Sequence, residues 1–454
     1  MRRLLLWVLT VVLALPPLLV GPAGSPAPAA PAAPPAVSWT DGEGIHVVSA
    51  QPEGDRLWRL VVSTAALSRP VRVNVLLPQG YDGRRRFPVL YLFHGTSGGA
   101  DDWLDAGGVE AATAAYPMVV VMPDAGYDGN GGSWFTDWVD QGTPLGAANW
   151  ESFHVQELLP YIDRHVRTLH ARGSRAIAGL SQGGFGALSY AARHPDLFVA
   201  AAGFSPAPDI WRDPRARVVG TTLVAAIMSG LNGVEPNAPF GDPLTHELTW
   251  AGHNPASLVT NLGHTDVALW CGNGIPGPLD PPGDVQGTPV EIAAHESTTY
   301  FTQAAQHDGV AVTFTDYGPG THSWPYWARD LTAYLPRLQQ VFDQHRRPPR
   351  RVDYRATEGS WAEWGWRVRS TAGPGWTALE NAGARRFTFT GRSAEITTPG
   401  RYRPRRAYAV TWLRGSGPAV VRADRRGRLV LEVTTDQGVA QATIRGLRAA
   451  AGAA

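Results

Sequence analysis

The sequence contains no lysine, and all 40 of its basic residues are arginine. Chemistry that needs a lysine amine is therefore excluded, namely Schiff-base catalysis and a phosphate-binding loop with its lysine. Cys271 is the only cysteine among 454 residues, so the chain cannot form an internal disulfide. Paired cysteines and the His-Glu-x-x-His pattern of zinc enzymes are also missing. We expect no metal and no other cofactor.

The chain begins with the pattern of an export signal. Two arginines precede an apolar run from Leu4 to Val20, and small residues follow. Pro16 and Pro17 interrupt this run, and no second run of that length occurs, which favours a signal peptide at 1–23 over a membrane span. An uncleaved anchor is the alternative. We predict a secreted, extracellular or envelope-associated protein without an integral membrane span after signal removal.

Composition divides the rest of the chain into a linker and two modules. Residues 24–36 are mainly Pro and Ala, a composition that forms an extended spacer rather than a core. From Arg350 onward 19 arginines stand against 8 acidic residues, a net charge of +11, whereas the remainder has 21 against 31, or −10. This split indicates a large domain at 37–346 and a small one at 351–454.

Strand-like and helical segments alternate in the large module, which is typical of a mostly parallel sheet with helices on both faces. The predicted strands are 45–49, 57–63, 71–76, 88–93, 118–122, 175–178, 197–203, 267–271 and 310–315. The predicted helices are 150–169, 182–193, 291–306 and 324–345. Pro160 should kink or shorten the first helix. Residues 205–264 break the alternation and are expected to form a lid or substrate-facing insertion.

A serine lies between two glycines where a predicted strand meets a predicted helix. The stretch Gly179-Leu-Ser181-Gln-Gly183 has the G-x-S-x-G spacing of a nucleophile elbow. Side chains at the flanking positions of so tight a turn would collide, so glycine is needed there. A chance glycine-rich turn is the alternative. The strand before it and the helix after it favour a nucleophilic Ser181 in an α/β-hydrolase fold.

A nucleophilic serine needs a base and an acid, which follow in the chain order serine, acid, histidine in this fold. Of 13 histidines, only His322 directly follows the last strand of the large module, so we predict it as the general base. The residues alone leave the acid open among Asp280, Asp284 and Glu291. Glu291 also fits a capping box that begins at Thr288, which would be a purely structural role.

Two backbone N–H groups are expected to stabilise the oxyanion of the tetrahedral intermediate. One belongs to Gln182, directly after Ser181. The other belongs to the glycine-rich loop after the strand at 88–93, and we place it at Thr96. Glycines allow this loop to approach the elbow closely, although loops of this composition also occur without such a role.

Seven blocks of the sequence follow one another in an order found in a known family. They are Tyr91-Leu-Phe-His-Gly95, Val120-Val-Met-Pro123, Phe135-Thr-Asp-Trp138, Trp150-Glu-Ser-Phe153, Gly179-Leu-Ser-Gln-Gly183, Trp270-Cys-Gly-Asn-Gly274 and Gly320-Thr-His-Ser-Trp-Pro-Tyr-Trp327. From about Val71 to Val341 the chain resembles the secreted mycolyltransferases of the esterase-D-type group of actinobacterial α/β-hydrolases. The resemblance implies a Ser-Glu-His triad whose glutamate begins the helix before the last strand, which matches Glu291 with an aromatic residue at Phe301.

Further residues are assigned by this resemblance. Trp324 matches a tryptophan that lines the sugar-acceptor pocket, with a core tryptophan as the alternative. Cys271 matches a cysteine near the active site, or is simply a small buried residue. Where the trehalose-using members have an aspartate and a nearby arginine, this chain has His94 and the stretch 97–99. We place His94 at the substrate, with a structural role as the alternative, and expect hydrolysis to compete with acyl transfer.

The C-terminal module has short alternating runs between Gly and Pro turns, which predicts a small β-sandwich. Its aromatic residues include Trp361, Trp364, Trp366, Trp376 and Trp412. With the many arginines they could form a face for sugars or anionic envelope polymers, but core tryptophans and a solvated charged face are more common. No nucleic-acid motif occurs, and we expect no nucleic-acid partner.

These patterns together predict a secreted serine esterase or acyltransferase. Ser181 attacks a carboxylic ester, His322 takes its proton, Glu291 orients the imidazolium, and water or an alcohol attacks the acyl-enzyme. The expected substrate is a small-molecule or lipid ester. Mycolyl-type transfer to a sugar or lipid of the cell envelope is one alternative. A non-catalytic protein that binds the cell wall or matrix is another, although every triad position is occupied.

Overall fold

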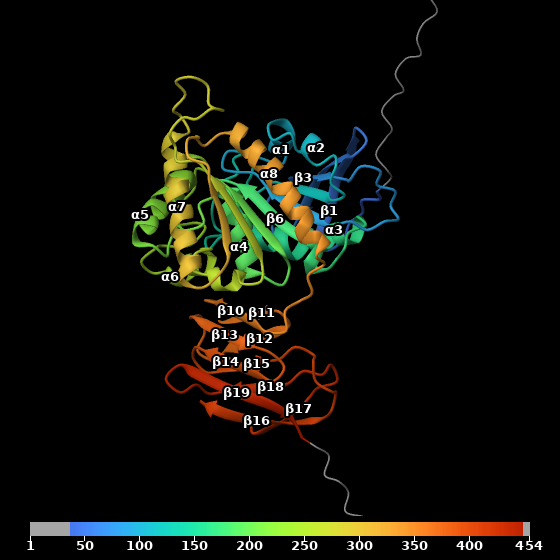
Figure 1. The fold of residues 1–454 in the computed structure, drawn as a ribbon, viewed down its shortest axis with the longest axis vertical. Coiled ribbons are helices and arrows are strands. Elements are labelled where there is room, and N and C mark those ends of the chain that lie inside the picture. The colour runs from blue at the N-terminus through green and yellow to red at the C-terminus, as the bar shows by residue number, and fades with distance from the viewer. Residues whose placement is uncertain (1–36, 448–454) are drawn as a thin grey trace, which may run out of the picture. The chain divides into compact units, whose positions relative to one another are not determined.

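The computed structural model describes residues 37–447. The predicted signal peptide at 1–23 and linker at 24–36 lie outside the described residues. Within them, an α/β part from β1 to α8 is followed by an all-β part from β10 to β19 (Figure 1). None of the described helices is both long enough and apolar enough to cross a lipid bilayer.

Nine strands of residues 37–447 form one mixed sheet in the α/β part, in the order β1-β2-β3-β5-β4-β6-β7-β8-β9. Their bounds are β1 Ile45–Glu53, β2 Leu57–Thr64, β3 Val71–Leu76, β4 Val89–Phe93, β5 Val119–Pro123, β6 Arg175–Leu180, β7 Ala200–Phe204, β8 Asp266–Cys271 and β9 Val312–Asp316. The strands β1, β2, β3 and β5 pair antiparallel, and those from β5 to β9 along the sheet pair in parallel. The predicted strands are confirmed, with their ends shifted by a few residues.

Helices cover both faces of this sheet, and the strand β4 shows how the sequence separates the two faces. The side chains of Val89, Tyr91 and Phe93 belong to one apolar core, together with residues of α4. Leu90 and Leu92 belong to the other core, which α8 covers. Successive side chains of a strand point to opposite faces, so a continuous apolar run is what a doubly covered strand requires.

The α/β part contains eight α-helices, one π-helix (η1) and two 3-10 helices (η2 and η3) among the described residues. Their bounds are α1 Asp102–Asp105, α2 Val109–Ala112, η1 Ser152–Leu158, α3 Leu159–His165, η2 Arg172–Ser174, α4 Gln182–Arg193, α5 Pro214–Gly230, α6 Glu247–His253, η3 Val259–Leu262, α7 Thr288–His307 and α8 Trp324–Asp343. The segment predicted as an insertion at 205–264 contains α5, α6 and η3, which account for 28 of its 60 residues.

The helix predicted at 150–169 is present over 150–165, with a change in its hydrogen-bond pattern. Residues 152–158 form the π-helix η1, and α3 continues from it without a break, with Pro160 near its start. Proline has no N–H to donate, and a local change of helical pattern is one way in which a chain accommodates the missing hydrogen bond.

The C-terminal part consists of two antiparallel sheets, in the orders β10-β13-β14-β19-β16-β17 and β11-β12-β15-β18. Their bounds are β10 Val352–Ala356, β11 Ser360–Glu363, β12 Trp366–Ser370, β13 Thr377–Ala382, β14 Arg386–Thr390, β15 Ala394–Thr397, β16 Ala407–Arg414, β17 Val420–Arg422, β18 Val430–Val433 and β19 Val439–Gly446. The all-β prediction is confirmed. Trp361, Trp364 and Trp366 lie in the core that both sheets share, which favours the structural interpretation of these tryptophans.

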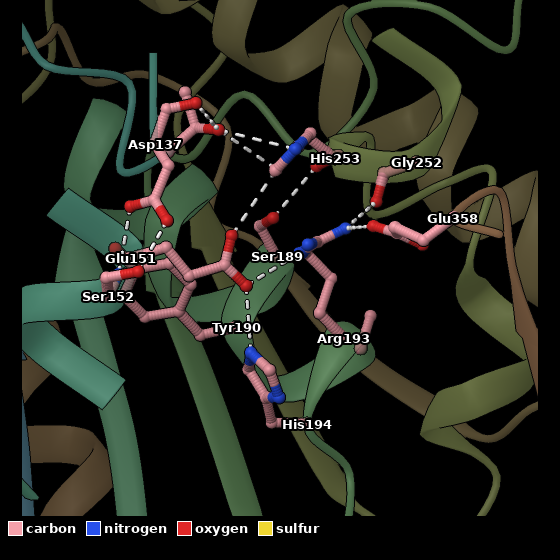
Figure 2. A network of polar contacts seen from close by, with 12 residues as sticks. Asp137, Glu151, Ser152, Ser189, Tyr190, Arg193, His194, Gly252, His253 and Glu358 are labelled. Atoms are coloured by element: carbon pink, nitrogen blue, oxygen red, sulfur yellow. Dashed lines mark hydrogen bonds and ion pairs between the residues drawn. The ribbon is translucent and has the colours of Figure 1, made fainter. Parts of the chain in front are cut away.

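A buried polar network joins the end of α4 to the C-terminal part (Figure 2). The guanidinium of Arg193 lies 2.7 Å from the carboxylate of Glu151 and also pairs with Glu358. The next residue, His194, lies 2.8 Å from Glu151 and 2.9 Å from Glu363. Each buried charge thus has a partner of opposite sign, which is the condition for keeping charges out of water.

The two carboxylates beside His194 change its protonation. Burial alone would lower the pKa of this imidazole, but the hydrogen bonds to Glu151 and Glu363 raise the pKa of His194 to about 10. Burial and the neighbouring Asp196 also raise the pKa of Glu363, to about 8, despite its contact with His194. In both cases the folded state binds its proton more tightly than the unfolded chain does, so a rise in pH lowers stability.

We therefore expect the free energy of unfolding to fall as the pH rises from about 6.5, the ordinary pKa of histidine, to about 10, the folded pKa of His194. The slope for one proton is at most about 1.4 kcal/mol per pH unit. His194→Gln should remove this part of the decline, as measured by urea unfolding at a series of pH values. The exposed His345, whose side chain forms no hydrogen bond or ion pair among residues 37–447, provides a control, because His345→Gln should keep the wild-type profile. Parallel profiles for His194→Gln and wild type would contradict the assignment.

Candidate active site

The nucleophile elbow is formed where β6 meets α4. Ser181, the residue between them, has φ 51° and ψ −123°, a backbone conformation that is strained for a residue with a side chain. A Cβ added at Gly179 would lie 2.4 Å from the carbonyl oxygen of Gly183. One added at Gly183 would lie 2.2 Å from the carbonyl oxygen of His94. Both glycines are required because the backbone passes too close for any side chain.

The structure brings together three side chains that we selected from the sequence. Ser181 comes from the elbow, Glu291 from the first turn of α7, and His322 from the loop between β9 and α8. The Nε2 atom of His322 lies 2.8 Å from Oγ of Ser181, and its Nδ1 atom lies 2.7 Å from Oε2 of Glu291. The three groups form one continuous chain of hydrogen bonds.

Glu291 is fully buried, and its second oxygen is held by other donors. Oε1 accepts hydrogen bonds from the N–H of Gly272 at 2.7 Å and the hydroxyl of Ser205 at 2.8 Å, with the thiol of Cys271 at 3.3 Å. Burial alone would raise the pKa of Glu291, but His322 and these donors keep the pKa below its usual value. An ionised carboxylate at this position can accept the N–H of Nδ1, which fixes the orientation of the imidazole and leaves Nε2 facing Ser181.

The other two candidate acids do not contact His322. Asp280 accepts hydrogen bonds from the N–H of Gly277 at 2.7 Å and the hydroxyl of Tyr326 at 2.8 Å. Asp284 lies on the exposed stretch before α7, at the wall of the cavity. Among the three acids that the residues alone left open, only Glu291 reaches the histidine.

The capping box that offered a structural role for Glu291 does not form. The helix α7 begins at Thr288, its N-cap is Gly287, and no side chain caps it. The N–H of Glu291 donates to the carbonyl of Gly287 at 3.0 Å, an ordinary helical hydrogen bond. The carboxylate is therefore not used by the helix terminus.

Two loops meet at the hydroxyl of Ser181. Thr96 and Gln182 both line the cavity into which this hydroxyl points. The N–H of Gln182 is the first of α4, a position without an intrahelical acceptor. A Cβ added at Gly95 would lie 3.1 Å from Cβ of Ser181, so the loop that carries Thr96 runs directly beside the elbow. The two N–H groups are thus candidate donors to an oxygen bound there.

His94 does not reach this cavity, and its predicted contact with the substrate is corrected. Its side chain is buried, with Nδ1 2.8 Å from the carbonyl oxygen of Gly95 and Nε2 accepting from the N–H of Ala125 at 2.9 Å. A neutral imidazole with its proton on Nδ1 satisfies both contacts. The ring therefore fixes the loop that carries Thr96, and no nitrogen is left for a ligand.

Trp324 and Trp327 line the cavity beside the histidine. The ring of Trp327 packs edge to face with His322 at 4.9 Å, and its Nε1 donates to the hydroxyl of Ser205 at 3.1 Å. The two tryptophans pack edge to face with each other at 5.2 Å. We did not assign a site role to Ser205 or Trp327 from the sequence. Trp327 lies within a block that we quoted, whereas no local motif marks Ser205.

Ser181 and His322 line a cavity of about 730 Å³. The segment that we predicted as a substrate-facing insertion contributes much of its apolar wall. The apolar lining includes Ile210, Val219, Leu223, Ile227 and, from α7, Val290. Volume and lining are those of a site for a small organic ligand or part of a larger one. Among residues 37–447, no cluster of three His, Cys, Asp or Glu side chains is arranged to hold a metal ion.

Residues 64–338 match the family model named Esterase, which is described as "Putative esterase". The match covers more than half of the chain. The chain belongs to this esterase family. The α/β-hydrolase fold and the resemblance to actinobacterial esterases and mycolyltransferases are thereby confirmed.

Related proteins come from mycobacteria. Esterase Rv1288 of Mycobacterium tuberculosis (strain ATCC 25618 / H37Rv) is 35% identical over 237 residues, which are 51% of this chain and 49% of that protein. The chain thus spans about half the length of this relative. Diacylglycerol acyltransferase/mycolyltransferase Ag85B of Mycobacterium leprae (strain TN) is 29% identical over 294 residues, 62% of this chain and 83% of that protein. The crystal structure of Mycobacterium tuberculosis MPT51 (FbpC1) has the same fold, with a TM-score of 0.51, 24% identity, and coverage of 62% of this chain and 97% of that one.

The close approach at the elbow can be tested by adding one methyl group. Gly183→Ala should lower the free energy of unfolding by about 2–4 kcal/mol, because the new Cβ would collide with a backbone oxygen that cannot move independently. Gly230, the last residue of α5, has open space around it, so Gly230→Ala should be neutral or slightly stabilising. Urea unfolding measures both variants. Equal stability of the two would contradict the contact between the elbow and the loop at His94.

Proposed function

We propose that this protein is a serine esterase that cleaves carboxylic esters through an acyl-enzyme at Ser181. The observation that supports this proposal is the chain of hydrogen bonds from Ser181 through His322 to Glu291 at the wall of a ligand-sized cavity. Membership of the esterase family supports the same class of reaction. Signal-directed secretion is also part of the proposal, and it is supported by the N-terminal sequence alone.

In the acylation step, Oγ of Ser181 attacks the ester carbonyl while Nε2 of His322 takes the hydroxyl proton. The imidazolium that forms is stabilised by Glu291, whose ionised carboxylate lies 2.7 Å from Nδ1. The carbonyl oxygen becomes an oxyanion, and the N–H groups of Thr96 and Gln182 donate to it. The proposed roles of all five residues require no cofactor.

The leaving alcohol then receives the proton from His322, and the acyl group remains on Ser181. Water enters, gives its proton to the same imidazole and attacks the acyl carbon, which releases the acid and restores the serine. The apolar wall at Ile210, Val219 and Leu223 suits an aliphatic or aromatic part of the ester. We therefore propose esters of small molecules or lipids as substrates.

Acyl transfer is the second candidate, because one relative is named as a diacylglycerol acyltransferase/mycolyltransferase. The chemistry up to the acyl-enzyme is the same, and an alcohol of a sugar or lipid replaces water in the second step. Trp324 at the cavity wall could support such an acceptor by packing against it. We place hydrolysis first because the buried His94 stands where trehalose-using members have a polar contact to the sugar.

Substitutions at the serine and at the acid should have separate signatures. Ser181→Ala should abolish labelling by a fluorophosphonate probe and lower kcat for a p-nitrophenyl ester on the order of 10⁶-fold. Glu291→Gln keeps the nucleophile but removes the charge that orients and stabilises His322, so kcat should fall about 10⁴-fold. Stopped-flow or discontinuous absorbance assays measure turnover, and mass spectrometry of the tryptic peptide locates the label.

Asp284→Asn provides a matched control, since Asp284 lies before the same helix and its carboxylate accepts from the N–H of Gln286 at 3.0 Å rather than from His322. We expect its kcat to stay within about threefold of wild type. A larger loss in Asp284→Asn than in Glu291→Gln would show that Glu291 is not the acid. Absence of both label and turnover in the folded wild type would favour a non-catalytic binding protein on this fold.

Hydrolysis and transfer differ in the molecule that attacks the acyl-enzyme, which is water in one case and the alcohol of a sugar or lipid in the other. With a model ester alone, the expected product is the free acid. Addition of trehalose or glucose at millimolar concentration should leave the free-acid yield unchanged if water is the acceptor, because the sugar then does not compete with water for the acyl-enzyme. Mass spectrometry of the products measures both outcomes. An acylated sugar formed at the expense of the acid would establish the transferase instead.

A further inference from the structure

The C-terminal part carries a dense group of arginines that has no role in the proposed ester chemistry. We call it the arginine surface, and it consists of Arg401, Arg403, Arg405, Arg406, Arg422, Arg425 and Arg426. All seven are exposed. None of them lines the cavity at Ser181. The surface is therefore separate from the proposed active site.

The arginines lie on two segments, 401–406 and 422–427. The two segments are paired by backbone hydrogen bonds next to β16 and β17, whose place is shown in Figure 1. The N–H of Tyr402 donates to the carbonyl of Gly427 at 3.0 Å, and the N–H of Arg405 donates to the carbonyl of Ala423 at 3.0 Å. The N–H of Ala423 in turn donates to the carbonyl of Arg406 at 2.9 Å. The seven arginines consequently project from one paired stretch of backbone.

The buried Tyr402 and the half-buried Tyr408 fix this stretch to the core of the C-terminal part. The ring of Tyr402 packs edge to face with Tyr408 at 4.9 Å, and its hydroxyl donates to the carbonyl of Ala384 at 3.0 Å. The hydroxyl of Tyr408 accepts from the N–H of Arg403 at 2.8 Å. The arginines are thus mounted on fixed backbone, which reduces the entropy lost when they bind a ligand.

The positive charge of the surface is not neutralised by the chain itself. Within residues 37–447, none of the seven forms an ion pair with a carboxylate. The only acidic residue in the two segments is Asp424, and it is occupied by Arg428 at 2.8 Å and by the N–H of Arg426 at 2.8 Å. Seven like charges held together repel one another and oppose folding. They indicate a ligand of opposite charge.

Several arginines near the surface of the α/β part, such as Arg59, Arg69 and Arg164, pair with an aspartate or glutamate. Others, such as Arg84 and Arg85, are exposed and form no ion pair among residues 37–447. The arginine surface differs because its seven unpaired arginines come from two segments whose backbones are hydrogen-bonded to each other. This density of positive charge supports a function in binding anions.

We infer that the arginine surface binds a linear anionic polymer whose charges are phosphate groups. Planar guanidinium groups bind phosphate oxygens in pairs, and several of them on one surface engage successive charges of a chain. The remaining side chains of the two segments are small or buried, as Pro404, Ala407 and Tyr402 show. A membrane would need apolar side chains to insert, and nucleic-acid bases would need exposed aromatic rings on which to stack. A phosphate polymer without bases fits the surface best.

The test uses the full chain and fluorescently labelled inorganic polyphosphate, with affinity measured by anisotropy at a series of salt concentrations. The variant combines Arg403→Gln, Arg406→Gln and Arg425→Gln, whose side chains form no ion pair among the described residues. Loss of three phosphate contacts should weaken binding at 0.1 M salt by at least about tenfold. The slope of log affinity against log salt should fall by about two, since fewer counterions are released.

The matched control combines Arg367→Gln, Arg369→Gln and Arg392→Gln, three exposed arginines elsewhere in the C-terminal part. It has the same change in net charge, and its affinity should stay within about threefold of wild type. Equal weakening of both triple variants would overturn the assignment to this surface. Near-ultraviolet circular dichroism and ester turnover should be unchanged in both, which separates this inference from the proposed esterase activity.

Competing ligands test the kind of polymer. Wild type should bind polyphosphate more tightly than single-stranded DNA of equal charge or vesicles of phosphatidylglycerol. Tighter binding to DNA or to the vesicles would overturn a base-free polymer as the occupant. No binding to polyphosphate at low salt would overturn the inference as a whole.

Discussion

The site depends on one buried contact, the hydrogen bond between Glu291 and His322. A carboxylate with no exposed surface stays ionised only if donors replace the water it has lost. Gly272 and Ser205 supply such donors, and the imidazole supplies another. Because these groups come from the ends of different strands, the charge on one glutamate requires the sheet to be assembled around it. Fold and proposed chemistry are linked at this contact.

The parallel order of the sheet explains how residues far apart in the chain meet. The loops after β4, β6, β7, β8 and β9 all leave from the same edge, since these strands run in one direction. They carry, in turn, the residues Thr96, Ser181, Ser205, Gly272 and His322. Ligand sites of open parallel sheets form at this edge for the same reason. The antiparallel strands β1 to β3 extend the sheet without contributing to the site.

The serine and the histidine of the site could be predicted because each has a local signal. Ser181 lies in a five-residue motif whose two glycines are needed in a tight turn. His322 is the one histidine that directly follows the last strand of the large module. Glu291 has no such signal, and its assignment needed the family resemblance in addition to topology. The buried strands could be predicted equally well, because a strand that is covered on both faces requires a continuous apolar run.

Other features depend on contacts that the linear sequence does not encode locally. Ser205 and Trp327 belong to the site because of contacts that exist only in the folded chain. The hydroxyl of Ser205 donates to Glu291, and Nε1 of Trp327 donates to that hydroxyl. His94 was misassigned because a sequence cannot show whether both ring nitrogens already have backbone partners. The π-helical segment before Pro160 is also not encoded locally, since proline permits a kink, a helix end or a local change of helical hydrogen bonding.

The ion pair between Arg193 and Glu358 has a consequence for how the chain can be divided. The helix α4 starts at the elbow and ends at this arginine, which pairs with Glu151 in the α/β part and with Glu358 beyond α8. A fragment that stopped after α8 would keep Glu151 as the partner of both Arg193 and His194 but would lose Glu358 and Glu363. The α/β part of this chain therefore depends on the C-terminal part to neutralise the charges at the end of the helix that begins beside Ser181.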